Sequence, residues 1–190
     1  MRKFIFNLDL SLETVDNTLL KCMADAWPML EELCISYESD DDDDDLDHDG
    51  RALQPTTQIT VDGLRALAAC PNLTKFEVAF NARLGTLSTT MQSLPQAMGT
   101  CNISLRYLAV GNSTISNARA LAAVLSEMFP NLESIRTHWL HSDPFYEQPD
   151  EQSALWRECS VSYHWFVAVR KQERESFERT CSKKDLVIMN

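Results

Sequence analysis

A six-residue pattern of apolar residues recurs four times along this chain and constrains its fold more than any other feature. The pattern is L-x-x-L-x-L, with Ile, Phe, Val or Thr at some apolar positions, and its copies begin at Leu30, Leu73, Leu105 and Leu132. Each copy follows a stretch whose apolar residues recur at helical spacing. One helix and one strand cannot bury their apolar sides alone, so the recurrence predicts that neighbouring units stack and shield one another.

The clearest unit occupies residues 59–80, with the sequence ITVDGLRALAACPNLTKFEVAF. Thr60 is positioned to cap a helix, and Pro71 and Asn72 separate this helix from a strand. The apolar residues of the helix and the strand are then predicted to share one side: Val61, Leu64, Leu67, Ala68, Leu73, Phe76 and Val78.

The spacing of the copies indicates a repeat architecture with insertions. Successive copies begin 43, 32 and 27 residues apart, and only the last step lies within the 20–29 residues typical of leucine-rich repeats, so the excess is assigned to loops. We predict an α/β fold: a short leucine-rich-repeat solenoid, a fragment of a right-handed α/β horseshoe with about four to five repeats, a parallel sheet and a C-terminal capping helix. In this fold Leu33, Phe76, Leu108 and Ile135 should stack in one continuous row.

The acidity of the chain belongs to one segment. The formal net charge is −11, but nine acidic residues fall within residues 38–49, so the rest of the chain carries only −2. Like charges without apolar residues predict a disordered insertion over residues 38–54. We interpret it as a solvated spacer. Two sharper alternatives are phosphorylation of Ser39 by an acid-directed kinase, and binding of a basic partner such as a histone or a nuclear-import factor.

The remaining stretches predict further elements. A strand is expected over residues 4–10, a helix capped by Ser11 and running to about Ala26, an irregular helix over 84–98, a helix over 116–128, a strand over 132–138 and a surface loop over 137–152. A longer helix should run from Ala154 to about Phe177, with its first half covering the last repeat and its second half projecting into water. The predicted organisation is a repeat domain at 1–153, a capping helix at 154–180 and a tail at 181–190 that is either a short strand or a disordered end.

The first strand is expected to lack a cover. A strand that starts near Phe4 with no cap before it predicts either that a longer architecture preceded Met1 or that a homodimer seals the edge. No stretch is apolar for the length that a membrane span needs, and the first residues lack the apolar core of a signal peptide. We therefore expect a cytoplasmic or nuclear protein.

The sequence contains no motif of catalytic chemistry. Its six cysteines are far apart without a C-x-x-C pair, and Cys70 and Cys101 are predicted to be small buried hydrophobes. His138 and His141 lie near Asp143, but their loop position and the lack of further ligands argue against a metal or acid–base site. No G-x-S-x-G, P-loop or G-x-G-x-x-G motif is present. We expect no enzyme activity, no cofactor and no metal, and, because there is no basic stripe, neither nucleic acid nor membrane as a partner.

Residues 59–78, with the pattern I-T-x-x-G-L-x-x-L-A-x-C-P-N-L-x-x-F-x-V, resemble the cysteine-containing repeats of F-box/leucine-rich-repeat proteins. The unit beginning at Pro130 and the helix over 156–173 look like the C-terminal part of the F-box-like proteins of mushroom-forming fungi. In that family an N-terminal F-box binds the adaptor of an SCF ubiquitin ligase, and the repeats bind the substrate. Residues 1–10 are too short for an F-box, so SCF components are expected as partners only if further sequence supplies one.

The predicted strands also define a candidate binding surface. Side chains alternate along a strand, so the residues between the leucines should face a concave surface that binds a protein partner. Tyr107, Arg136 and His138 are the best anchors, because aromatic and Arg side chains carry much of the energy of interfaces. The alternative is a solvated face that binds nothing. The candidate residues are Glu32, Ser36, Lys75, Glu77, Tyr107, Arg136 and His138, with Cys34, Ala79, Ala109, Gly111 and Ser134 at the other positions of this face.

Two functions follow from these observations. The first is a non-catalytic protein–protein interaction module, a substrate-recognition portion related to SCF F-box proteins. The second is an autonomous structural or regulatory repeat protein that binds basic partners through its acidic segment.

Overall fold

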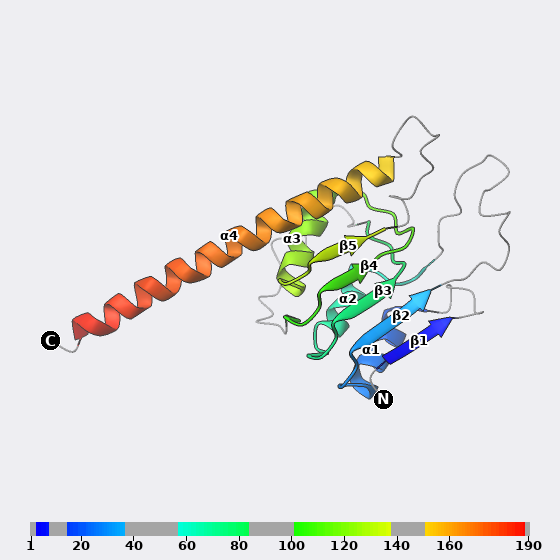
Figure 1. The fold of residues 1–190 in the computed structure, drawn as a ribbon, viewed down its shortest axis with the longest axis horizontal. Helices are drawn as coiled ribbons and strands as arrows, with labels where there is room; N and C mark the ends of the chain where they lie inside the picture. Colours follow the sequence, from blue (N-terminus) through cyan, green and yellow to red (C-terminus); the bar gives the residue numbers. More distant parts are fainter. Residues whose placement is uncertain (1–2, 8–14, 37–56, 84–100, 138–150, 189–190) are drawn as a thin grey trace.

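The computed structural model describes residues 3–7, 15–36, 57–83, 101–137 and 151–188, which form an α/β fold (Figure 1). Within these residues a single sheet contains five parallel strands in the order of the sequence, β1-β2-β3-β4-β5. The strands are β1 (Lys3–Asn7), β2 (Glu32–Ser36), β3 (Lys75–Val78), β4 (Tyr107–Ala109) and β5 (Ser134–Arg136), and the helices are α1 (Asn17–Ala26), α2 (Val61–Leu67), α3 (Ala118–Met128) and α4 (Glu151–Ile188).

The strands are in register, so their apolar residues form continuous rows. Leu33 pairs with Phe76, Phe76 with Leu108, and Leu108 with Ile135. The first three side chains are fully buried and Ile135 is partly buried. The predicted row is therefore confirmed. Helices α1, α2 and α3 lie on one side of the sheet (Figure 1), and the core occupies the space between these helices and the row.

The start of α1 differs from the prediction. Asp16 is the N-cap, because its Oδ1 accepts a hydrogen bond from the Leu19 amide at 2.8 Å, and the helix begins at Asn17. The expectation that Ser11 starts this helix is wrong, since Val15 and Asp16 precede the helix, and Asp16 is extended and bridges to Gln58. An N-cap residue stands where the backbone changes from extended to helical. In this chain that position is Asp16, five residues later than predicted.

The predicted cap of α2 is in place, but it works differently. Thr60 occupies the N-cap position without a capping bond from its own side chain. Instead, Asn17 of α1 clamps Thr60: the Thr60 amide donates to Asn17 Oδ1 at 2.9 Å, and Asn17 Nδ2 donates to Thr60 Oγ1 at 2.9 Å. One side chain thus ties the starts of two neighbouring helices together.

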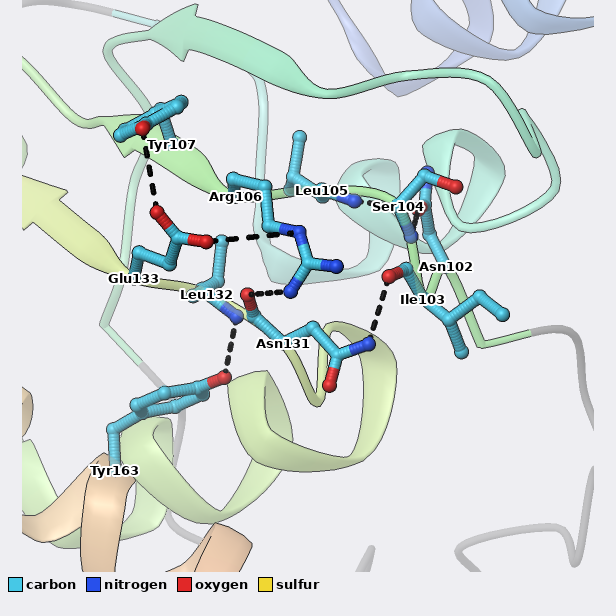
Figure 2. A network of polar contacts seen from close by, with 10 residues as sticks. All are labelled: Asn102, Ile103, Ser104, Leu105, Arg106, Tyr107, Asn131, Leu132, Glu133 and Tyr163. Atoms are coloured by element: carbon cyan, nitrogen blue, oxygen red, sulfur yellow. Dashed lines mark hydrogen bonds and ion pairs between the residues drawn. The ribbon is translucent and has the colours of Figure 1, made fainter.

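The turns that lead into β2, β3 and β4 are closed at equivalent positions. The Leu30 amide donates to the Trp27 carbonyl at 3.0 Å, and the Leu73 amide donates to the Cys70 carbonyl at 3.2 Å. In the turn before β4 the acceptor is a side chain, because the Leu105 amide donates to Asn102 Oδ1 at 2.8 Å. Figure 2 shows Asn102 folded into this turn.

Asn102 also links this turn to the previous one. It is buried, and its Nδ2 donates to the Cys70 carbonyl at 2.7 Å. Cys70 itself is buried, as predicted, whereas Cys101 is exposed, so the prediction of a buried Cys101 is wrong. The physical reason is that Asn102 fills the inward position with a side chain that satisfies polar groups, which leaves its neighbour pointing outward.

The fourth turn, before β5, is closed by a residue from α4. Tyr163 Oη accepts from the Leu132 amide at 2.8 Å (Figure 2) and donates to the Phe129 carbonyl at 2.6 Å. Burial raises the pKa of Tyr163 to about 12. The phenol therefore stays protonated and joins the two ends of a turn whose counterparts before β2 and β3 close directly, main chain to main chain.

The first half of α4 packs against α3 and this last turn, as the sequence predicted. Trp156, Cys159 and Tyr163 are buried, and Trp156 Nε1 donates to the Ser113 carbonyl at 2.8 Å. Burial raises the pKa of Cys159 to about 12. The side chains of residues 171–177 are exposed, in agreement with a second half that projects into solvent.

Helix α4 is longer than expected. It begins at Glu151 and continues to Ile188, through residues 181–188 where we expected a short strand or a disordered end. Over the described parts of the chain, none of the helices combines the length and the apolar character that crossing a bilayer requires. The predicted acidic insertion at 38–54, the helix over 84–98, most of the loop over 137–152 and His138 lie outside the described residues.

Candidate functional site

The sheet face opposite the helices carries the residues that the sequence singled out. We call it the open face and define it by two rows of strand positions that pair across the sheet. The first row is Lys3, Glu32, Lys75, Tyr107 and Ser134, and the second is Ile5, Cys34, Glu77, Ala109 and Arg136. From β2 to β5 every residue of these rows is exposed or partly exposed, whereas Leu33, Phe76 and Leu108 between them are buried.

The structure therefore brings five predicted residues together. Glu32, Lys75 and Tyr107 share the first row, while Glu77 and Arg136 share the second. Ser36 pairs in register with Asn7 at the end of β2, and nothing further of its side chain is described. His138 lies outside the described residues, so its role and that of Ser36 stay predictions.

Two ion pairs neutralise charge on the β1–β3 side of the open face. Lys3 Nζ lies 2.8 Å from Glu32 Oε2, and Lys75 Nζ lies 4.0 Å from Glu77 Oε2. The hydrogen bond between Lys3 and Glu32 raises the pKa of Lys3 and lowers that of Glu32. Because these side chains are in contact with water, the pairs set the local charge pattern and add little to stability.

Lys3 is a member of this face that the repeat pattern of the sequence did not predict. Its strand lacks the L-x-x-L-x-L pattern, so its register against β2 was not predicted. The only available signal was alternation: Lys3 lies one residue before Phe4, the residue that pairs with the buried Leu33.

Tyr107 is held in place by a polar network at the start of β4 and β5. Its hydroxyl donates to Glu133 Oε2 at 3.3 Å, while Glu133 Oε1 lies 3.8 Å from Arg106 Nε. Arg106 also donates from Nη1 to the Asn131 carbonyl at 3.3 Å. Figure 2 shows Glu133 between Tyr107 and Arg106. The residue remains 44% exposed, so its ring presents an oriented aromatic surface to solvent.

Arg136 is the open-face charge without a counter-charge in the described structure. Its guanidinium makes no hydrogen bond or ion pair with any residue that the structure describes. Ala109 separates it from Glu77 of β3 in the same row. Adjacent strands lie about 4.8 Å apart, so Glu77 and Arg136 stand roughly 10 Å from each other, on either side of a methyl group.

The small residues continue past the ends of the strands. Gly111 follows β4 with φ of +54°, and a Cβ at this position would lie 3.5 Å from the Cβ of Ala79. Thr137 Oγ1 donates to the Gly111 carbonyl at 2.9 Å and holds this turn against the end of β5. Ala79, Ala109 and Gly111 therefore form a low floor between the longer side chains.

This arrangement combines several features that are common at protein interfaces. Its features are an oriented aromatic ring, one cation without a counter-charge among the described residues, one partly paired anion and a floor of small residues. Within the described residues no group of three or more His, Cys, Asp or Glu side chains could hold a metal ion. A scan against protein-family models and searches of curated proteins and of solved structures found no match to this chain.

Proposed function

We propose that this chain is a non-catalytic protein-binding module that holds its partner on the open face of the sheet. The observation that supports this function is the contrast between the two faces. One face is packed under the helices, while the other keeps Tyr107 and Arg136 accessible in a continuous in-register surface. A solvated face needs neither an oriented tyrosine nor an arginine that has no counter-charge among the described residues, and both residue types are enriched at the centres of interfaces.

The proposed architecture is a short leucine-rich-repeat solenoid, part of a right-handed α/β horseshoe. Three features support it: parallel strands in the order of the sequence, helices on one side of the sheet, and turns closed at equivalent positions before β2, β3, β4 and β5. Such solenoids present extended inner surfaces for binding. Together with the resemblance of residues 59–78, these features favour a substrate-recognition portion related to the F-box proteins of SCF ubiquitin ligases.

The chemistry of the open face defines the complementary partner. A carboxylate is the natural counter-charge for Arg136, because a guanidinium donates two parallel hydrogen bonds to it. An apolar side chain fits over Ala109, next to the ring of Tyr107. A cation on the far side of this floor would meet Glu77. The partner is therefore a protein segment with an acidic group and a basic group on either side of an apolar one.

Affinity purification with matched variants tests this proposal. The tagged chain, Arg136→Glu, Tyr107→Ala and a control, Lys21→Glu, are used to capture proteins from cell extract, and captured proteins are quantified by mass spectrometry. Lys21 is exposed on α1, away from the open face, and its substitution makes the same change of charge as Arg136→Glu. A specific partner should be retained by Lys21→Glu and reduced about tenfold or more by both open-face variants. If all four chains capture the same proteins in equal amounts, the open face is not the binding surface.

The alternative function depends on the acidic segment. Nine acidic residues within residues 38–49 favour binding of a basic partner. A variant with Asn at positions 40–45 separates the two functions in the same experiment. Basic proteins lost only from this variant would support the regulatory alternative, whereas recovery of an SCF adaptor and cullin with a chain that includes an F-box would support the ligase relationship.

A further inference from the structure

Helix α4 has a second apolar face, opposite the one that packs on α3. Val161, Trp165 and Val169 are 56%, 70% and 48% exposed. They are four residues apart, and at 100° per residue they lie on the side of α4 away from Trp156 and Tyr163, which are buried. A tryptophan exposed to this extent between two valines is a feature of contact surfaces.

We propose that this face binds a second copy of the chain, with the two α4 helices packed antiparallel around a two-fold axis near Trp165. A two-fold axis places the same patch on both sides of the interface. In this register Trp165 meets Trp165 of the second copy, and Val161 meets Val169 of the second copy. The bodies of the two molecules lie on opposite sides of the helix pair, because α3 packs against the other face of each α4.

The charges beside this face are self-complementary. Arg157 and Glu175 lie on the same flank of α4, nearly equidistant from its centre at Trp165, and both are exposed. Neither side chain makes an ion pair with any other described residue. In an antiparallel pair the same flanks of both helices face each other, so Arg157 of each copy meets Glu175 of the other. Glu151 and Arg179 are spaced in the same way, fourteen residues on either side of Trp165.

The pairing also accounts for the projecting half of α4. Arg170 Nε donates to Ser126 Oγ of α3 at 3.0 Å, and Arg174 still lines a crevice with Ser126; the helix then extends away from the body of the molecule (Figure 1). A helix without tertiary contacts is only marginally stable in water. The proposed register lays residues 171–179 over residues 151–159 of the second copy, and the overlap from 151 to 179 is roughly 40 Å long.

Charge exchange tests the proposal. The association of the chain is measured by sedimentation equilibrium from about 1 to about 100 µM, a range in which a specific dimer of ordinary affinity dissociates measurably. Arg157→Glu and Glu175→Arg each place like charges together twice and should weaken the dimer about tenfold or more. The double variant restores unlike charges and should recover the affinity to within about threefold.

Two further variants complete the experiment. Arg174→Glu is the matched control, because Arg174 is exposed on α4 but lines the crevice with Ser126 and Pro130 on the α3 side. It should associate like the unchanged chain. Trp165→Asp should be monomeric, with an unchanged circular dichroism spectrum because the side chain is exposed. A chain that stays monomeric at the highest concentration, a dimer unaffected by Trp165→Asp, or a double variant no tighter than its parents would each overturn the proposal.

Discussion

Replacement of Tyr163 by phenylalanine tests how α4 stabilises the last part of the sheet. The hydroxyl accepts from the Leu132 amide at 2.8 Å and donates to the Phe129 carbonyl at 2.6 Å, in a site where the side chain is 1% exposed. Tyr163→Phe removes only this oxygen and keeps the ring. Both main-chain groups then lose their partner at a place that water does not reach.

The size of the effect follows from those two groups. A buried donor or acceptor left without a partner costs about 1–3 kcal/mol. The turn can partly relax, because the equivalent turn before β3 closes directly, with the Leu73 amide 3.2 Å from the Cys70 carbonyl. We therefore expect the free energy of unfolding to fall by about 2 kcal/mol. With a denaturant slope of about 2 kcal/mol per molar urea, the unfolding midpoint moves down by about 1 M.

Urea unfolding followed by circular dichroism measures this change, and Tyr107→Phe is the matched control. The Tyr107 hydroxyl makes one exposed hydrogen bond to Glu133, at 3.3 Å, so its loss should change the free energy of unfolding by less than about 0.5 kcal/mol. Equal effects of the two substitutions, or an unchanged urea midpoint for Tyr163→Phe, would contradict a stabilising role of the Tyr163 hydroxyl.

Two other perturbations test the contact between α1 and α2 and the burial of ionisable side chains on α4. Replacing glycine by alanine usually stabilises a helix by about 1 kcal/mol. At Gly63, however, a Cβ would overlap Asn17 Oδ1, so Gly63→Ala should lower the free energy of unfolding by about 1–2 kcal/mol. A variant that is more stable in urea unfolding would contradict this expectation. Burial raises the pKa of both Cys159 and Tyr163 to about 12, above their values in the unfolded chain, so the stability that these two groups contribute should be fully present below about pH 9 and be lost as the pH rises toward 12. Urea midpoints measured across this range, with Cys159→Ala as the comparison, check the slope; equal midpoints throughout would refute it.

The sheet and its buried row could be predicted from the sequence because a periodic pattern specifies them. Leu33, Phe76 and Leu108 each occupy the same position of L-x-x-L-x-L, and strand periodicity places the residues beside them on the opposite face. The open-face position of Tyr107 followed from that alternation alone. Its orientation did not, because it depends on Glu133, which lies 26 residues away.

The wrong predictions for the start of α1 and for the burial of Cys101 have local causes. Val15 fits the apolar spacing of a helix, yet it is buried just before the helix begins, so spacing alone placed the start of α1 too early. Cys101 and Asn102 are neighbours, and either could fill the inward position. The choice of Asn102 depends on carbonyl groups of the preceding turn, which only the folded chain brings within reach. The same holds for Tyr163, whose apolar spacing was visible while its bonds to Phe129 and Leu132 were not.

The row Glu77, Ala109, Arg136 gives the open face a direction. Moving from β3 to β5, a ligand passes from a negative to a positive side chain across a neutral methyl group. A ligand bound in the reverse orientation would place its acidic group beside Glu77 and its basic group beside Arg136. Both contacts would then be repulsive, and each would lower the affinity. The module should therefore distinguish a binding sequence from its reversed counterpart of identical composition.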